Sequence, residues 1–215
     1  MLPIIAFVGR SNSGKTTVMS GVIANLKARG LNIAVIKHAH EFELEKKGTS
    51  SWSLGQAGAD TVVVSSPEEL AIMKKTDHDF TPQEIARMID GDCDLVLTEG
   101  YKKSSTTKIE VHRKEQNPGS LLVPEKELLA VVTNEPLKVS VPQFDRDDIK
   151  GVADIIAKWL SEQPKEETEV IVNGYFVPLN RFVKDFVAKT VAGMLSVLKT
   201  EGEIKNVQIT IRRKA

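Results

Sequence analysis

Short apolar runs alternate with helical patterns along the first 160 residues of this 215-residue chain. The runs predict strands at residues 4–8, 32–36, 61–64, 95–98, 108–111 and 129–132. Apolar residues at helical spacing follow the first strand as far as Gly30, and a second clear helix begins near Asp147 or Asp148. This alternation is typical of an α/β fold, in which helices flank a mostly parallel sheet. A shorter helix is predicted at Thr81, since Pro82 suits the first helical position and Glu84 can close a capping box.

The pattern changes after Leu160. Residues 161–168 are polar, contain a proline and have no apolar period, so we interpret them as a linker between a nucleotide-binding domain (1–160) and a small unit (169–215). In that unit, Asn173-Gly174 predicts a hairpin turn and Asn180 a helix cap, and Val207 opens an alternating strand. The expected order is β-β-α-β. Because some fifty residues bury little surface alone, we expect this appendage to pack on the first domain or on a second copy.

Composition narrows the function classes. The chain has 29 basic and 29 acidic residues and a pI near 6.9, so nothing in its overall charge favours nucleic-acid binding. No apolar run approaches the roughly 20 residues that span a bilayer, and the first residues do not resemble a signal peptide. We therefore expect a cytoplasmic protein without membrane insertion. Cys93 is the only cysteine, which rules out a disulfide framework or a multi-cysteine zinc site.

A phosphate-loop pattern, G-x-x-x-x-G-K-[ST], occupies residues 9–16, between the first strand and its helix. Glycines allow backbone N–H groups to turn toward a phosphate, and the helix N-terminus is electropositive. Lys15 is predicted to reach the β- and γ-phosphates, and the Thr16 hydroxyl to bind Mg²⁺. The alternative is a chance glycine-rich turn, which the flanking strand and helix disfavour. The fold class expected is therefore a sheet of the P-loop NTPase type.

An acid ends the strand at 95–98. In parallel sheets, ligands bind at the carboxyl ends of strands, so Glu99 is predicted to lie beside the phosphate loop. There it could hold a water on Mg²⁺ or orient an attacking water, and Gly100 would let the backbone approach the ligand. The alternative is a strand-ending acid that faces solvent.

A third polar cluster, Lys37, His38 and His40, follows the strand at 32–36. We favour contact with substrate or phosphate over zinc, because two histidines two residues apart point in opposite directions on an extended chain. An ordinary loop position is an equal alternative for either histidine. Farther along, charges alternate at Lys108, Glu110, His112 and Arg113, a pattern that by itself predicts only a solvated face.

Four segments occur in one order: the phosphate loop through Thr17, Ile36-Lys37-His38, residues 97–102 and residues 108–111. Together they resemble the molybdopterin-guanine dinucleotide biosynthesis protein B family, over roughly residues 1–160. The resemblance implies a dimeric P-loop protein that binds and weakly hydrolyses GTP. It also implies that the protein assists a separate guanylyltransferase, which attaches GMP to molybdopterin. Where this family pattern has an aspartate and a Gly-Lys-Asp-Ser-like stretch, this chain has residues 45–51, in which Lys46 or Lys47 could substitute for the lysine.

Loop pattern and resemblance together define the predicted site. Lys15 and Glu99 are the expected catalytic residues, and Thr16 and Glu99 the expected Mg²⁺ residues. The residues expected to contact the nucleotide are Gly9, Asn12, Ser13, Gly14, Lys15, Thr16, Thr17, Lys37, His38, Gly100 and Asn134.

The choice of base rests on the resemblance, since no Asn-Lys-x-Asp guanine signature is present. Thr133 and Asn134 follow a strand at a suitable place to meet guanine. Two alternatives stay open. One is a small-molecule kinase that uses ATP, for which Arg10 and Arg113 are the only convenient arginines. The other is a nucleotide-switched adaptor with negligible turnover.

Overall fold

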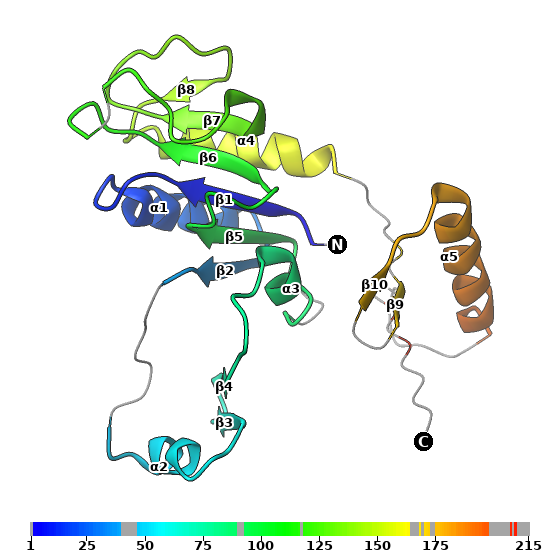
Figure 1. The fold of residues 1–215 in the computed structure, drawn as a ribbon. Helices are drawn as coiled ribbons and strands as arrows, with labels where there is room; N and C mark the ends of the chain where they lie inside the picture. Colours follow the sequence, from blue (N-terminus) through cyan, green and yellow to red (C-terminus); the bar gives the residue numbers. More distant parts are fainter. Residues whose placement is uncertain are drawn as a thin grey trace.

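A six-stranded parallel sheet forms the centre of the protein, seen in a computed structural model that describes residues 2–39, 47–89, 93–116, 118–163, 168, 170–172, 175–197, 207 and 209 (Figure 1). The strand order is β2-β5-β1-β6-β7-β8, and every neighbouring pair runs parallel. The strands are β1 Ile4–Val8, β2 Ile33–Lys37, β5 Leu95–Glu99, β6 Thr107–Val111, β7 Leu128–Val132 and β8 Gln143–Phe144. The expected α/β fold of the P-loop NTPase type is confirmed. The central strand β1 is buried along its whole length, as its continuous apolar run predicts.

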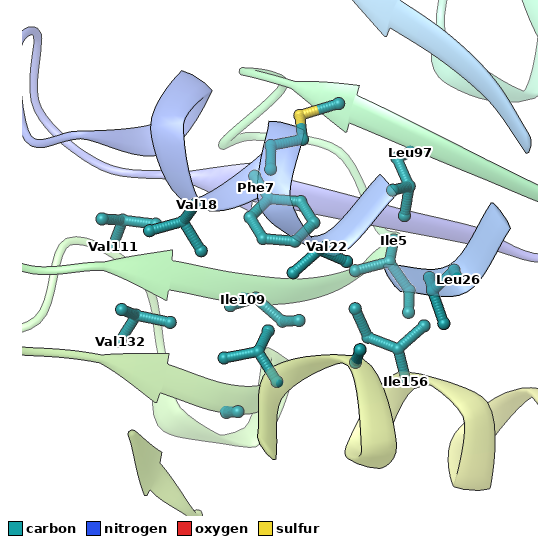
Figure 2. Packing of buried hydrophobic residues seen from close by; sticks show 14 of the residues in the cluster. Ile5, Phe7, Val18, Val22, Leu26, Leu97, Ile109, Val111, Val132 and Ile156 are labelled. Atoms are coloured by element: carbon teal, nitrogen blue, oxygen red, sulfur yellow. The ribbon is translucent and has the colours of Figure 1, made fainter. Parts of the chain in front are cut away.

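Two long helices, α1 (Lys15–Ala28) and α4 (Ile149–Ser161), lie side by side on one face of this sheet. Their apolar sides enclose the main core (Figure 2). Phe7 and Ile109 project from the sheet into this core, where they meet Val22 of α1 and Ile156 of α4. Both helices fall where their apolar spacing predicts, and Asp148 caps α4 by accepting a hydrogen bond from Gly151 N.

The opposite face of the sheet is covered by a short helix and by loops. Helix α3 (Pro82–Ala86) packs there, and its predicted capping box is confirmed, since the Thr81 hydroxyl accepts from Glu84 N and the Glu84 carboxylate accepts from Thr81 N. A second small core around Val131 is closed by the loop that follows β6 and contains the 3₁₀ turn η1 (Glu125–Glu127). The loop begins at the carboxyl edge of the sheet, directly after β6, and its first residues contribute to the site described below.

The run at 61–64 is a strand, but it does not join the sheet. β3 (Thr61–Ser65) pairs antiparallel with β4 (Leu70–Lys74), and together with α2 (Ser50–Gln56) they form an arm that stands apart from the sheet (Figure 1). The continuous apolar run predicts burial on both faces, whereas its side chains here are largely exposed. A four-residue turn held by the Ser66 hydroxyl, which accepts from Glu69 N, makes the hairpin local and independent of the sheet.

The C-terminal segment contains the antiparallel strands β9 (Val170–Val172) and β10 (Tyr175–Val177), followed by α5 (Arg181–Leu195). Asn180 caps α5 by accepting from Val183 N, as predicted. The Asn173-Gly174 turn, residues 164–167 of the linker and most of the final predicted strand lie outside the described residues. The division into two domains therefore stays a prediction. None of the helices within the described residues has both the length and the apolar composition of a membrane-spanning segment.

Candidate nucleotide-binding site

The turn between β1 and α1 has the backbone shape that its glycines predict. Asn12 and Gly14 adopt positive φ angles of 61° and 95°, and Gly14 caps the first turn of α1. A Cβ atom on Gly9 would lie 2.5 Å from the Val111 carbonyl oxygen and 2.7 Å from Ser13 Oγ, so only glycine fits where the loop passes β6. The loop thus curls tightly at the N-terminus of a helix, the usual arrangement of an anion site.

Polar groups inside this turn are disposed as a phosphate would require. Lys15 Nζ reaches back across the loop and donates to the Arg10 carbonyl oxygen at 2.8 Å. The Ser13 side chain is fully buried, and its Oγ has no hydrogen-bond partner among the described residues. A buried hydroxyl without a partner is costly unless a ligand completes its hydrogen bonding. The predicted residues Gly9, Ser13, Gly14 and Lys15 therefore fit a bound phosphate.

Thr16 and Glu99 are brought together as predicted. The Thr16 hydroxyl lies 3.1 Å from both carboxylate oxygens of Glu99, although 83 residues separate them in sequence. β5 lies between β1 and β2, so Lys37 at the end of β2 reaches the same carboxylate, with Nζ 3.9 Å from Oε2. A hydroxyl beside a carboxylate offers the oxygen ligands that Mg²⁺ prefers, so these residues fit the implied ion. Thr17 lies next to Thr16 in the first turn of α1, exposed to solvent.

His38 lies at this edge of the sheet, as predicted, but its ring contacts Asp79, a residue that was not predicted from the sequence. His38 Nε2 is 3.0 Å from a carboxylate oxygen of Asp79, in the loop after β4. The ring also packs on Tyr101, with centroids 4.4 Å apart. Gly100 (φ 107°) makes this approach possible, since a Cβ there would lie 3.2 Å from that of His38, and Tyr101 adopts a positive φ of 56°. His40 lies outside the described residues.

Two side chains from the loop after β6 hold the outer side of the phosphate loop. Arg113 Nε donates to the Ser13 carbonyl oxygen at 2.9 Å, and Gln116 Nε2 donates to the Ser11 carbonyl oxygen at 2.8 Å. We call Arg113 and Gln116 the clasp. Because the clasp fixes two carbonyl oxygens, it favours the loop conformation that leaves backbone N–H groups for an anion. The sequence indicates Arg113 only as a charged residue and gives no signal for Gln116.

The alternating charges of β6 are buried, so the prediction of a solvated face is wrong for Lys108, Glu110 and His112. The physical reason is that β6 lies between β1 and β7, with its polar side chains under the loop that follows it. Lys108 Nζ lies 2.8 Å from the Glu127 carboxylate, and the Glu110 carboxylate accepts from Leu122 N at 2.9 Å.

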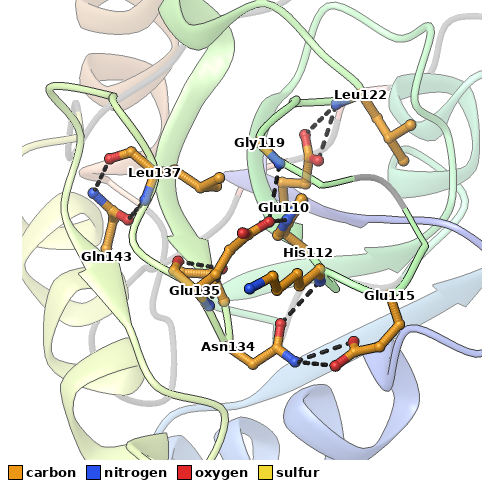
Figure 3. Close-up of polar contacts among 11 residues, drawn as sticks. Glu110, His112, Glu115, Gly119, Leu122, Asn134, Glu135, Leu137 and Gln143 are labelled. Carbon is orange, nitrogen blue, oxygen red and sulfur yellow. Dashed lines mark hydrogen bonds and ion pairs between the residues drawn. The ribbon is translucent and has the colours of Figure 1, made fainter.

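Further contacts fasten the loop that carries the clasp (Figure 3). Glu135 Oε1 lies 2.9 Å from His112 Nε2 and accepts from Gly119 N at 2.9 Å. Asn134 Oδ1 accepts from Lys114 N at 3.0 Å, and its amide donates to Glu115. Burial raises the pKa of the Glu110 carboxyl, whereas the Gly119 N–H lowers the pKa of Glu135. Asn134, expected at the base, here joins two loops.

A glycine-rich turn between a buried parallel strand and a helix, with a lysine, a threonine and a neighbouring strand-end acid, places the protein in the P-loop NTPase class of folds. Residues 4–134 match the sequence model of the family described as Molybdopterin guanine dinucleotide synthesis protein B. The match covers more than half of the chain, and the protein belongs to this family.

Relatives agree with this assignment. Two proteins named molybdopterin-guanine dinucleotide biosynthesis adapter protein are similar to this chain. The one from Haemophilus influenzae is 36% identical, covering 74% of this chain and 90% of the relative. The one from Escherichia coli is 34% identical, with coverages of 76% and 96%. The crystal structure of Bacillus subtilis MobB is 26% identical with a TM-score of 0.58, and it covers 75% of this chain and all of that one.

Proposed function

We propose that this protein binds GTP with Mg²⁺ and acts as an accessory protein in the formation of molybdopterin guanine dinucleotide, assisting a separate guanylyltransferase. The names of its relatives support the pathway. The observation that carries nucleotide binding is the contact between Thr16 and Glu99 at the mouth of a formed phosphate loop. This hydroxyl–carboxylate pair has no evident packing role, whereas it is what a metal–phosphate site requires.

Each residue has a role in this proposal. Backbone N–H groups from Asn12 to Thr16 and the Lys15 ammonium bind the phosphates, for which Lys15 exchanges the Arg10 carbonyl for a phosphate oxygen. Thr16 and Glu99 hold the metal, and Lys37 orients the Glu99 carboxylate. Mg²⁺, when bound, offsets the charge of the phosphates and supports slow hydrolysis. Thr17 and Gly100 line the approach to the same edge.

A nucleotide-controlled adaptor role fits the loop after Glu99. Gly100 and Tyr101 both hold positive φ angles immediately beyond the carboxylate, and Tyr101 contacts His38. A residue other than glycine in this conformation is strained, so a shift of Glu99 toward a metal can be passed to the surface at Tyr101. Such a switch requires different partner affinities with GTP, with GDP and without nucleotide, because equal affinities exclude coupling by linkage.

We further propose that the protein is a homodimer and that the α2–β3–β4 arm contacts the second copy. Among the described strands, β3 and β4 pair only with each other, which leaves an open edge on each strand. Leu54, Val63, Leu70 and Ile72 of the arm are each more than half exposed. A second copy of the same arm would cover both the open edges and this apolar surface.

Isothermal titration with GTP and with ATP, each with Mg²⁺, tests the choice of nucleotide. We expect GTP to bind at least about tenfold more tightly, which corresponds to 1.4 kcal/mol. The Asn134→Ala variant is expected to lose GTP affinity and to keep ATP affinity if Asn134 contacts guanine. Equal losses for both nucleotides would assign Asn134 only its role in joining loops, and a preference for ATP would support the kinase alternative.

A further inference from the structure

A cavity of about 620 Å³ lies beside the phosphate loop, on the side of its first residues. This volume is within the usual range of small-molecule sites. Residues 12–16, whose N–H groups would surround the nucleotide phosphates, do not line it. Its lining residues are Gly9, Arg10, Ser11, Lys102, Gln116 and Leu122. The cavity is therefore separate from the phosphate cradle but shares a wall with it.

Two cations from different elements line this cavity. Arg10 belongs to the phosphate loop, and Lys102 follows β5 three residues after Glu99. Among the described residues, neither side chain forms an ion pair or a hydrogen bond. Two uncompensated cations on one cavity create a positive potential, which favours a multiply charged anion such as a phosphate monoester.

The remaining wall selects the other part of a ligand. Gln116 Nε2 donates to the Ser11 carbonyl oxygen, which fixes this side chain in the wall of the cavity. Leu122, whose backbone N–H is fixed by the Glu110 carboxylate, adds a partly exposed apolar surface on which a flat ring can pack.

We propose that this cavity binds a second small molecule, a phosphate monoester carried on a ring, next to the bound nucleotide. Arg10 and Lys102 bind the phosphate, and Leu122 packs on the ring. That a nucleotide lies beside this site rests on the function proposed above, whereas the recognition of the monoester rests only on these three side chains.

Phenyl phosphate is a suitable probe, titrated calorimetrically into full-length protein already saturated with Mg²⁺ and the β,γ-imido analogue of GTP. We expect saturable binding at one site. Lys102→Gln should bind at least about fivefold more weakly, because the lost contact between the Lys102 ammonium and the phosphate is worth on the order of 1 kcal/mol or more. Lys103→Gln is the matched control: it removes an adjacent exposed lysine outside the cavity lining, and its affinity should stay within about twofold of wild type.

Three results would overturn the proposal: no saturable binding to the nucleotide-loaded protein, equal losses in Lys102→Gln and Lys103→Gln, or equal affinity for phenol, which lacks the phosphate. Titration of the GTP analogue comes first, and its result tests the proposed function independently of the phenyl phosphate titration. If the nucleotide does not bind, phenyl phosphate is instead titrated into Lys15→Ala. This variant lacks the lysine of the phosphate loop, where the probe could otherwise bind, and it keeps all six lining residues of the cavity.

Discussion

Buried charge on β6 is the feature at residue scale that links the sheet to the nucleotide site. Glu110 is fully buried, and its carboxylate accepts hydrogen bonds from Leu122 N and Val123 N. These two contacts hold the loop that carries the clasp against the end of β6. Because burial disfavours the ionised form, the pKa of this carboxyl is raised above its ordinary value.

Substitution of Glu110 separates its charge from its hydrogen bonds. For an acid with a raised pKa in the folded state, ionisation costs stability as the pH rises from the unfolded-state pKa through the folded-state pKa. Glu110→Gln avoids this cost and keeps an acceptor oxygen. We therefore expect its free energy of unfolding, relative to wild type, to increase from pH 5 to pH 8 in urea titrations. Glu110→Ala leaves two buried N–H groups unpaired and should lose about 2 kcal/mol.

Glu115→Gln is the control for this pH dependence. Its exposed carboxylate has a lowered pKa, first because of its own backbone N–H, so its relative stability should show no rise over the same interval. A flat profile for Glu110→Gln would contradict the view that burial sets the pKa of Glu110.

Individual residues differ in how well the sequence predicts them. Lys15 and Thr16 follow from a local pattern whose spacing has a physical cause, and Glu99 follows from its place at the end of a buried parallel strand. Asp79 and Gln116 could not be predicted, because each comes from a loop whose path depends on tertiary packing. Lys108 and Glu110 suggest a solvated face, and only the loop that covers them reverses that interpretation.

At the scale of elements, the loop after β6 acts as an outer support for the phosphate loop. Arg113 contacts the Ser13 carbonyl oxygen directly, and its guanidinium lies 3.4 Å from where a Cβ of Gly14 would be. The support is fixed at its far end through Gly119 and Glu135. The shape of the phosphate cradle therefore depends on an element that contributes no residue to the loop pattern itself.

Removal of the clasp arginine tests this dependence. Arg113→Ala frees the Ser13 carbonyl oxygen to turn inward, so GTP affinity should fall about tenfold in calorimetric titrations. Lys114→Ala removes a neighbouring exposed cation and should leave affinity within about twofold of wild type. Similar affinities for the two variants would show that the clasp does not organise the cradle. A large loss of thermal stability in Arg113→Ala would instead indicate a general structural role.

Elements were predictable where local signals agree with the tertiary environment. The capping box of α3 and the caps of α4 and α5 are encoded by adjacent residues and are confirmed. The strand at β3 was predicted, but its place outside the sheet was not, since a run of valines looks the same in a buried strand and in an exposed hairpin. The edge strand β8 has only two residues, of which Phe144 alone is apolar, and this is too short a pattern to predict a strand.

For the whole molecule, the exposed arm is the surface best suited to hold two copies together. Ile72 is 62% exposed on β4, so Ile72→Lys should leave the monomer fold intact while placing a charge in the proposed contact. We expect light scattering coupled to size exclusion to report a dimer for wild type and a monomer for Ile72→Lys. Glu69→Lys, in the exposed hairpin turn, introduces the same side chain and should remain dimeric. A dimeric Ile72→Lys protein would exclude the arm as the contact.

The central claim is that residues 9–16 bind a nucleotide together with Mg²⁺. The most direct measurement is calorimetric titration of GTP into wild type and Lys15→Ala, each with and without Mg²⁺, with Lys27→Ala from the end of the same helix as the control. The account predicts Mg²⁺-dependent binding by wild type and Lys27→Ala, and at least about a hundredfold loss in Lys15→Ala. Undiminished binding of GTP by a folded Lys15→Ala protein would contradict it.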